Sequence, residues 1–213
     1  MDLNRHPPDS CRAGLPGETP LDDYSGLIPK DVRTVAQLSV VEIQNSAMAV
    51  TKYLSRRPTK RMAPFTRQWM LRLHGEMFGE VWSWAGEVRT SSGLNVGVEA
   101  HRIASEMELL AQDTAYWAEH GGDAMEQAGA IHHRSVYIHP FLNGNGRWAR
   151  LLGQIWQYRK LGFYTEWPEA EMWHGLTPLR EEYINALKEA DRGNLESLLD
   201  LQRRFTPTLR DDL

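Results

Sequence analysis

A chain of 213 residues, 41% of them hydrophobic, is long enough to bury the core of one domain. Its 28 acidic residues outnumber its 24 Lys and Arg residues, and the net charge of −4 argues against a broad electrostatic grip on nucleic acid. The single cysteine, Cys11, excludes an intrachain disulfide, and no apolar run approaches the ~20 residues of a membrane span. We therefore expect a cytoplasmic protein with no membrane contact and no direct nucleic-acid partner.

The first part of the chain differs in composition from the rest. Residues 1–24 are polar and rich in Pro and Gly, which predicts a loose N-terminal arm without the hydrophobic stretch of a secretory signal. Helical periodicity dominates from Leu27 onward. We expect one domain over residues 25–205 and a C-terminal tail over residues 206–213.

Apolar periodicity and capping residues place the helices. Thr66 precedes an apolar-periodic stretch as an N-cap, and Asp123 with Glu126 has the spacing of a capping box. Residues 87–100 carry Gly and Ser with short Val/Leu alternation, which favours an extended loop or a small hairpin. The sequence thus predicts a mainly all-α fold with one short β-hairpin. The expected helices cover residues 38–54, 66–86, 101–117, 123–137, 145–160, 169–191 with a break near Pro178, and 194–205.

The segment IHPFLNGNGRWAR, residues 138–150, is the most informative stretch of the chain. One helix is expected to end near its first residue, with His139 at the start of a loop. Gly144 and Gly146 allow tight turns and a close approach of a ligand to the backbone N–H groups. The next helix begins at about Asn145, and the unpaired N–H groups of a helix N-terminus favour an anion.

The helix that follows this loop has two distinct faces. Arg147, Arg150 and Gln154 share one face, where two guanidiniums can grip phosphate oxygens bidentately. The opposite face is expected to pack into the core. The loop and this face together predict a polyphosphate cradle with a histidine at its edge. The predicted core face consists of Trp148, Leu151, Leu152, Ile155 and Trp156.

Each of these features also has an ordinary structural explanation. A histidine before proline is usually structural, paired arginines usually form a solvated helix face, and Asn-Gly-Asn-Gly usually forms a turn. Their occurrence within 12 residues, in an order that builds one pocket, favours the functional interpretation.

The segment resembles the signature of the Fic family, His-x-Phe-x-(Asp/Glu)-Gly-Asn-Gly-Arg-x-x-Arg, at every specified position except Asn143. Flanking residues are similar as well, including His132-His133-Arg134 and Trp84-Ala85-Gly86-Glu87-Val88-Arg89. The resemblance covers residues 27–202. Within the family, the chain is most similar to the Fic-related mobile mystery protein B group.

The resemblance implies a protein adenylyltransferase that transfers AMP from ATP to a hydroxyl of a target protein. His139 would act as general base, a role that suits an imidazole at neutral pH. The amides of Gly144, Asn145 and Gly146 would hold the α- and β-phosphates. Arg147 would then pair with the β-phosphate and Arg150 with the γ-phosphate.

Three further expectations follow from the resemblance. Asn143 stands where the family has an acidic ligand of Mg²⁺ or Mn²⁺, so we expect weak metal binding there or a carboxylate supplied from elsewhere. Leu94, Asn95 and Val96 would form a flap that pairs with an extended segment of the target. The family's inhibitory motif is absent, but Glu42 could face Arg150 as an inhibitory contact, and inhibition could otherwise come from a separate antitoxin-like protein.

Other functions stay open at this point. A catalytically weak nucleotide-binding module of a mobile-element or toxin–antitoxin-like system is the main alternative, because Asn143 carries no charge. A metal hydrolase would use His132, His133 and His139, but adjacent histidines on a helix point about 100° apart. A purely structural helical domain is the remaining alternative.

Overall fold

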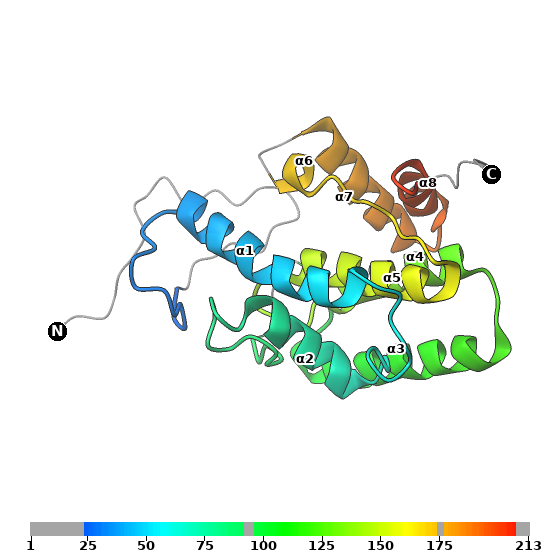
Figure 1. Ribbon diagram of the computed structural model, residues 1–213, viewed down its shortest axis with the longest axis horizontal. Coiled ribbons are helices and arrows are strands. Elements are labelled where there is room, and N and C mark those ends of the chain that lie inside the picture. The colour runs from blue at the N-terminus through cyan, green and yellow to red at the C-terminus, as the bar shows by residue number, and fades with distance from the viewer. Residues whose placement is uncertain (1–23, 92–95, 174–176, 208–213) are drawn as a thin grey trace.

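A computed structural model describes residues 24–91, 96–173 and 177–207 of the chain (Figure 1). The described residues form eight helices and no β-strand, apart from one isolated antiparallel bridge between Leu27 and Trp82. Leu94 and Asn95 of the expected hairpin lie outside the described residues, and Val96 lies in a bend. The helices are α1 (Val35–Leu54), α2 (Arg67–Phe78), α3 (Ala100–His120), α4 (Ala124–Ile138), α5 (Asn145–Leu161), α6 (Glu169–Trp173), α7 (Pro178–Ala190) and α8 (Glu196–Arg204).

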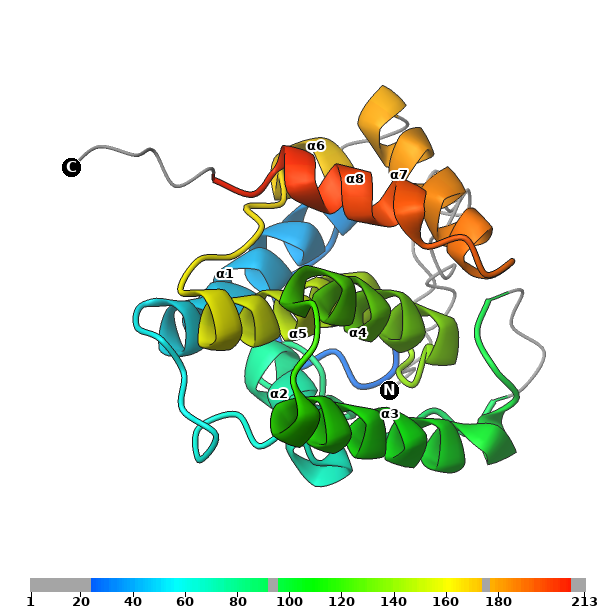
Figure 2. The ribbon, with the colours of Figure 1, turned by 90° about the vertical axis from the view of Figure 1, so that its right-hand side faces the viewer.

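Helices α4 and α5 form the centre of the fold and are its most extensively packed pair. Figure 2 shows them between α2 and α3 on one side and α6, α7 and α8 on the other. Gly153 allows the two helices to approach closely, because a Cβ there would lie 3.1 Å from the carbonyl oxygen of Ala128. The predicted core face of α5 is confirmed, since all five of its side chains are at most 1% exposed.

Short polar side chains start the helices where the sequence predicts them. Thr66 accepts a hydrogen bond from the N–H of Trp69, and Asp123 caps the first turn of α4. Pro178 occupies the first turn of α7 behind the N-cap Thr177, so the expected break in the region 169–191 is confirmed.

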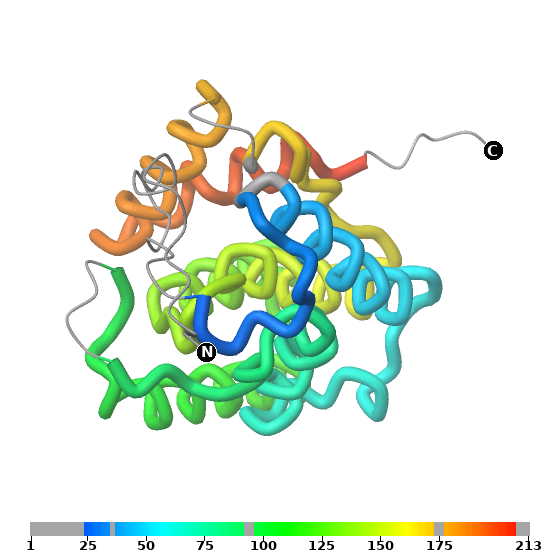
Figure 3. The backbone as a smooth tube through the Cα atoms, turned by 90° about the vertical axis from the view of Figure 1, so that its left-hand side faces the viewer, coloured from blue at the N-terminus to red at the C-terminus, as the bar shows by residue number. Residues whose placement is uncertain are grey.

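The predicted length of the second helix is wrong, because α2 ends at Phe78 instead of continuing to Gly86. Beyond Phe78 the chain turns so that Trp82 enters the core, where it is 1% exposed. The segment before α1, which can be followed in dark blue in Figure 3, pairs with this turn. The N–H of Ile28 donates to the carbonyl of Val81, and the N–H of Ser83 donates to that of Gly26. Tertiary pairing therefore overrides helical periodicity here.

Two separate hydrophobic clusters stabilise the described chain. The larger one contains side chains from all five helices α1, α2, α3, α4 and α5. The smaller one is built by α6, α7 and α8 around Trp167, Met172, Tyr183 and Leu198. Among the described residues, no helix has the length and apolar character that crossing a membrane requires. The boundary between the two clusters is one side of the site described next.

Candidate nucleotide site

The loop between α4 and α5 is bounded by two residues in the left-handed region. His139 ends α4 with φ 50° and ψ 60°, and Gly144 begins α5 with φ 78°. A Cβ at Gly144 would lie 2.6 Å from the ring of Phe78. Both its conformation and its surroundings therefore require glycine at this position. No side chain forms an N-cap hydrogen bond at the start of α5, so only the loop lies in front of its first turn.

Two side chains lock the shape of this loop. Asn145 bonds Phe141 reciprocally, accepting from its N–H at 3.0 Å and donating to its carbonyl at 2.8 Å. His74 is fully buried and bonds the carbonyl of Asn143 at 3.0 Å. Because Nδ1 of His74 accepts the N–H of Gly86, its Nε2 carries the proton and donates. Burial lowers the pKa of His74 to about 3, so this histidine stays neutral and serves the structure of the loop.

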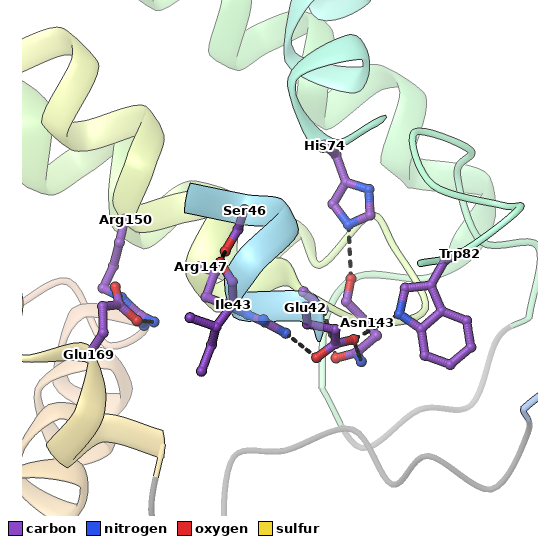
Figure 4. Close-up of polar contacts among 10 residues, drawn as sticks. Glu42, Ile43, Ser46, His74, Trp82, Asn143, Arg147, Arg150 and Glu169 are labelled. Atoms are coloured by element: carbon purple, nitrogen blue, oxygen red, sulfur yellow. Dashed lines mark hydrogen bonds and ion pairs between the residues drawn. The ribbon is translucent and has the colours of Figure 1, made fainter. Parts of the chain in front are cut away.

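Both arginines of the predicted cradle are buried and each holds a carboxylate (Figure 4). Arg147 is 7% exposed and contacts Glu42 of α1 at 2.6 Å. Arg150 is 3% exposed and binds both carboxylate oxygens of Glu169 of α6, at 2.7 and 2.6 Å. The two guanidiniums thus lie inside the protein, and each binds a carboxylate from a different helix, α1 or α6.

Glu42 lies against Arg147 and not against Arg150, which corrects the expected contact. Its Oε1 accepts hydrogen bonds from the indole N–H of Trp82 at 2.7 Å and from Nδ2 of Asn143 at 3.0 Å. Helix α1 packs on α2 and α5, and this places Glu42 at the first turn of α5. Arg150 lies one turn further along α5, where Glu169 meets it. Three donors therefore form a receptor for one carboxylate.

Arg150 is fixed by a wider polar network. Its guanidinium lies 5.7 Å from the ring centroid of Tyr183, whose hydroxyl bonds Nε2 of His132 at 2.8 Å. Burial by itself lowers the pKa of Arg150, but the Glu169 carboxylate and Tyr183 outweigh it and raise the pKa above its ordinary value. The positive charge of Arg150 is therefore permanent and well supported within the site.

Asn143 does not offer the oxygen that a metal would need. Its Oδ1 accepts the N–H of Gly144 at 2.7 Å, while its Nδ2 faces Glu42. Mg²⁺ binds through oxygen ligands that usually include carboxylates. The residues as arranged therefore do not fit a metal ion. Metal binding by Asn143 stays a prediction.

The described residues also speak against the metal-hydrolase alternative. His132 bonds Tyr183, while Nε2 of His133 contacts Asp191 at 2.8 Å, so the two rings diverge. Within the described ranges, no group of three or more His, Cys, Asp or Glu side chains could hold a metal ion. Geometry, in addition to sequence spacing, thus disfavours a shared metal.

The imidazole of His139 is 6% exposed. Burial, and next the charge of Arg89, lower the pKa of His139 to about 4, although a hydrogen bond with the backbone of Val136 opposes this shift. The ring is therefore neutral at pH 7 and able to accept a proton, as a general base must be. Gly97 covers this residue, since a Cβ there would lie 2.5 Å from Cβ of His139.

The roles of four residues in this site were not predicted from the sequence: His74, Trp82, Arg89 and Glu169. Arg89 lies in the segment of residues 84–89 that is similar to the Fic family, but the resemblance assigns it no function. Glu169 had no comparable signal, because a glutamate near a helix start is common and usually solvated. Only the tertiary structure brings it to Arg150.

Comparisons with known proteins point to one family. Residues 64–156 match the model of the Fic/DOC family. The chain is 27% identical over 201 residues to protein adenylyltransferase VbhT of Bartonella schoenbuchensis, an alignment that covers 85% of this chain and 38% of VbhT. The chain thus spans well under half of the length of that relative.

The fold is similar to that of solved Fic domains. One is the N-terminal Fic domain of a VirB-translocated Bep effector protein from Bartonella quintana with bound ADP, at a TM-score of 0.63 and 20% identity over 85% of this chain and 90% of that one. Another is BepC from Bartonella tribocorum with bound AMPPNP, at a TM-score of 0.62 and 18% identity over 84% and 90% of the two chains. The eight helices of the described residues have the Fic fold, and residues 64–156 are the part of the chain that matches the Fic/DOC family.

Proposed function

We propose that this protein transfers AMP from ATP to a hydroxyl side chain of a target protein. The observation that carries the proposal is the pair of buried guanidiniums on the first turns of α5, each holding an oxyanion. Arg147 and Arg150 are three residues apart, about 4.5 Å along the helix axis, which suits neighbouring phosphates of one nucleotide. The relatives support it, since VbhT is an adenylyltransferase and the Bep domains were solved with ADP and AMPPNP.

The chemistry assigned to the chain is one substitution at phosphorus. The neutral ring of His139 takes the proton of a Tyr, Thr or Ser hydroxyl as its oxygen attacks the α-phosphorus of ATP. The bond from that phosphorus to the bridging oxygen of the β-phosphate breaks, and diphosphate leaves. Arg147 and Arg150 hold the departing charge, and the amides of Gly144, Asn145 and Gly146 orient the α- and β-phosphates.

The described conformation is a closed form of this site. Glu42 and Glu169 occupy the two guanidiniums that the phosphates would use, so ATP must displace both carboxylates. Because a buried arginine stripped of its partner is costly, each carboxylate leaves only when a phosphate replaces it. Glu42 is thereby assigned the inhibitory role, exerted through Arg147.

A second candidate function rests on Asn143. Its oxygen is engaged by Gly144 and its amide supports Glu42, which favours holding the site closed over assisting transfer. In that case the protein binds nucleotide without transferring it and acts as an interaction module of a mobile-element or toxin–antitoxin-like system. We likewise propose that the chain belongs to the mobile mystery protein B group, with a separate protein as its regulator.

One labelling experiment separates these functions. The protein is incubated with ATP labelled at the α-phosphate, Mg²⁺ or Mn²⁺, and cell lysate. We expect protein-bound label with the wild type, more label with Glu42→Gln, and none with His139→Ala. His133→Ala is the matched control, because that imidazole pairs with Asp191 at the surface, and it should keep the wild-type signal. Nucleotide binding without label in every variant would favour the second function.

A further inference from the structure

Arg89 is a buried residue whose guanidinium lies against the backbone of His139. It is 3% exposed, and its Nε donates to the carbonyl of His139 at 2.7 Å. Its Nη1 donates to the carbonyl of Ser91 at 2.7 Å, and its Nη2 donates to that of Val98 at 2.5 Å. The backbone N–H of Arg89 also donates to the carbonyl of Pro140 at 2.9 Å. One side chain thus joins His139 to the residues on both sides of the expected flap.

The backbone of His139 needs such support. It has φ 50°, a left-handed conformation that costs a non-glycine residue about 1 kcal/mol or more. Its N–H is held by Ser135 of α4, and its carbonyl is held by Arg89. With both ends of the residue fixed, the direction of its Cα–Cβ bond is fixed too, and with it the position from which the imidazole extends.

The segment after the expected flap lies directly on this residue. Gly97 has φ 92°, and a Cβ there would approach Cβ of His139 to 2.5 Å and Nη2 of Arg89 to 2.9 Å. The N–H of Val98 donates to the carbonyl of Ile138 at 3.4 Å. Any displacement of Ser91 or Val98 would therefore reach His139 through the guanidinium that they share.

We infer that Arg89 is a positioning residue for His139, which holds the imidazole in its reactive orientation and makes that orientation depend on the segment that flanks the target-docking flap. The inference takes the role of His139 from the proposed function. A guanidinium suits the task because its planar fork reaches several carbonyls at once and does not lose its charge. Its charge acts in the same direction as burial on the pKa of His139, while a hydrogen bond with the backbone of Val136 opposes both. Glu99 is the acidic group that acts on Arg89 itself.

The test follows the imidazole directly, by NMR titration of the protein labelled at its histidines. The resonance of His139 is assigned by its loss in His139→Gln. In Arg89→Gln we expect the pKa of His139 to rise from about 4, because the charge is gone, although burial, the larger cause, remains. In Arg89→Lys we expect it to stay low. Both variants should lower turnover at least tenfold while the KM for ATP changes less than about twofold, since Arg89 bonds backbone carbonyls around His139.

Arg102→Gln is the matched control, because Arg102 lies near this segment but pairs with Glu106 at the surface, and it should change neither quantity. An unchanged pKa in folded Arg89→Gln, or wild-type turnover in Arg89→Lys, would overturn the inference. If Arg89→Gln does not fold, the inference is tested in Arg89→Lys, by its turnover and by the rate of hydrogen exchange at the N–H of Val98. If the wild type transfers no AMP, the titration and the exchange still decide on Arg89, while the proposed function fails separately.

Discussion

The contact between Glu42 and Arg147 is the most direct point at which to test the closed site. In Glu42→Gln the side chain keeps its size, and its Oε1 can still accept from Trp82 and Asn143. The group facing Arg147, however, becomes an N–H donor in place of a carboxylate oxygen at 2.6 Å. Both side chains are 7% exposed, so water cannot replace the lost partner.

Two opposite effects are expected from this substitution. Leaving the Arg147 charge without its buried partner should lower the free energy of unfolding by roughly 3 kcal/mol, or about 6–12 °C in melting temperature for a chain of this size. The affinity for ADP or AMPPNP should instead rise at least about tenfold, equivalent to ~1.4 kcal/mol, because no carboxylate has to be displaced. Thermal unfolding and calorimetric titration measure the two quantities.

The combination of lower stability and tighter nucleotide binding is the signature of a competing carboxylate. Glu76→Gln is the control, because it removes a carboxylate from an ion pair between α1 and α2 whose side chains are 53% and 25% exposed. It should cost less than about 1 kcal/mol and leave nucleotide affinity unchanged. If Glu42→Gln is destabilised but binds ADP no more tightly than the wild type, Glu42 does not compete with phosphate and the closed-site reasoning is wrong.

Three further predictions can be checked with similar measurements. Glu169→Gln should tighten AMPPNP binding roughly tenfold. It should lower stability less than Glu42→Gln does, since the Glu169 side chain is 45% exposed. Glu171→Gln, on the same helix, is the control and should change neither AMPPNP affinity nor stability. Gly144→Ala should lower the free energy of unfolding by about 2 kcal/mol or more, because Gly144 has a left-handed φ and a Cβ there would meet the ring of Phe78. Gly146→Ala is the control and should leave the free energy of unfolding nearly unchanged. Urea unfolding measures both. Because the pKa values of His74 and His139 are lowered to about 3 and about 4, the unfolded chain binds more protons below pH 6.5. The free energy of unfolding should therefore fall from pH 6.5 towards pH 3, by ~3 kcal/mol per histidine at pH 4. In His139→Gln, the part of this fall that is due to His139 should be absent.

Local sequence patterns predicted most of the helices and the chemistry of the loop. The caps Thr66 and Asp123, the apolar face of α5 and the break at Pro178 were all readable, because each depends on neighbours within one or two turns. The end of α2 was not readable, since it depends on Trp82 entering the core beside a segment some fifty residues earlier in the chain.

The partners of the two arginines show the same limit. The sequence indicated that Arg147 and Arg150 would share a helix face near a glycine-rich loop, and the structure places them there. It gave a weak reason to consider Glu42 and none to consider Glu169, because both contacts bridge more than one element and depend on how α1 and α6 pack. The assignment of partners to buried charges therefore required the tertiary structure.

The division of the described chain into two hydrophobic clusters has a consequence for regulation. Arg150 lies on α5, a helix of the larger cluster, yet the carboxylate that holds it lies on α6 and the aromatic ring beside it on α7, two helices of the smaller cluster. Under the proposed function, a molecule that binds the outer surface of the last three helices would thus alter how tightly Arg150 holds the terminal phosphate, without approaching the nucleotide.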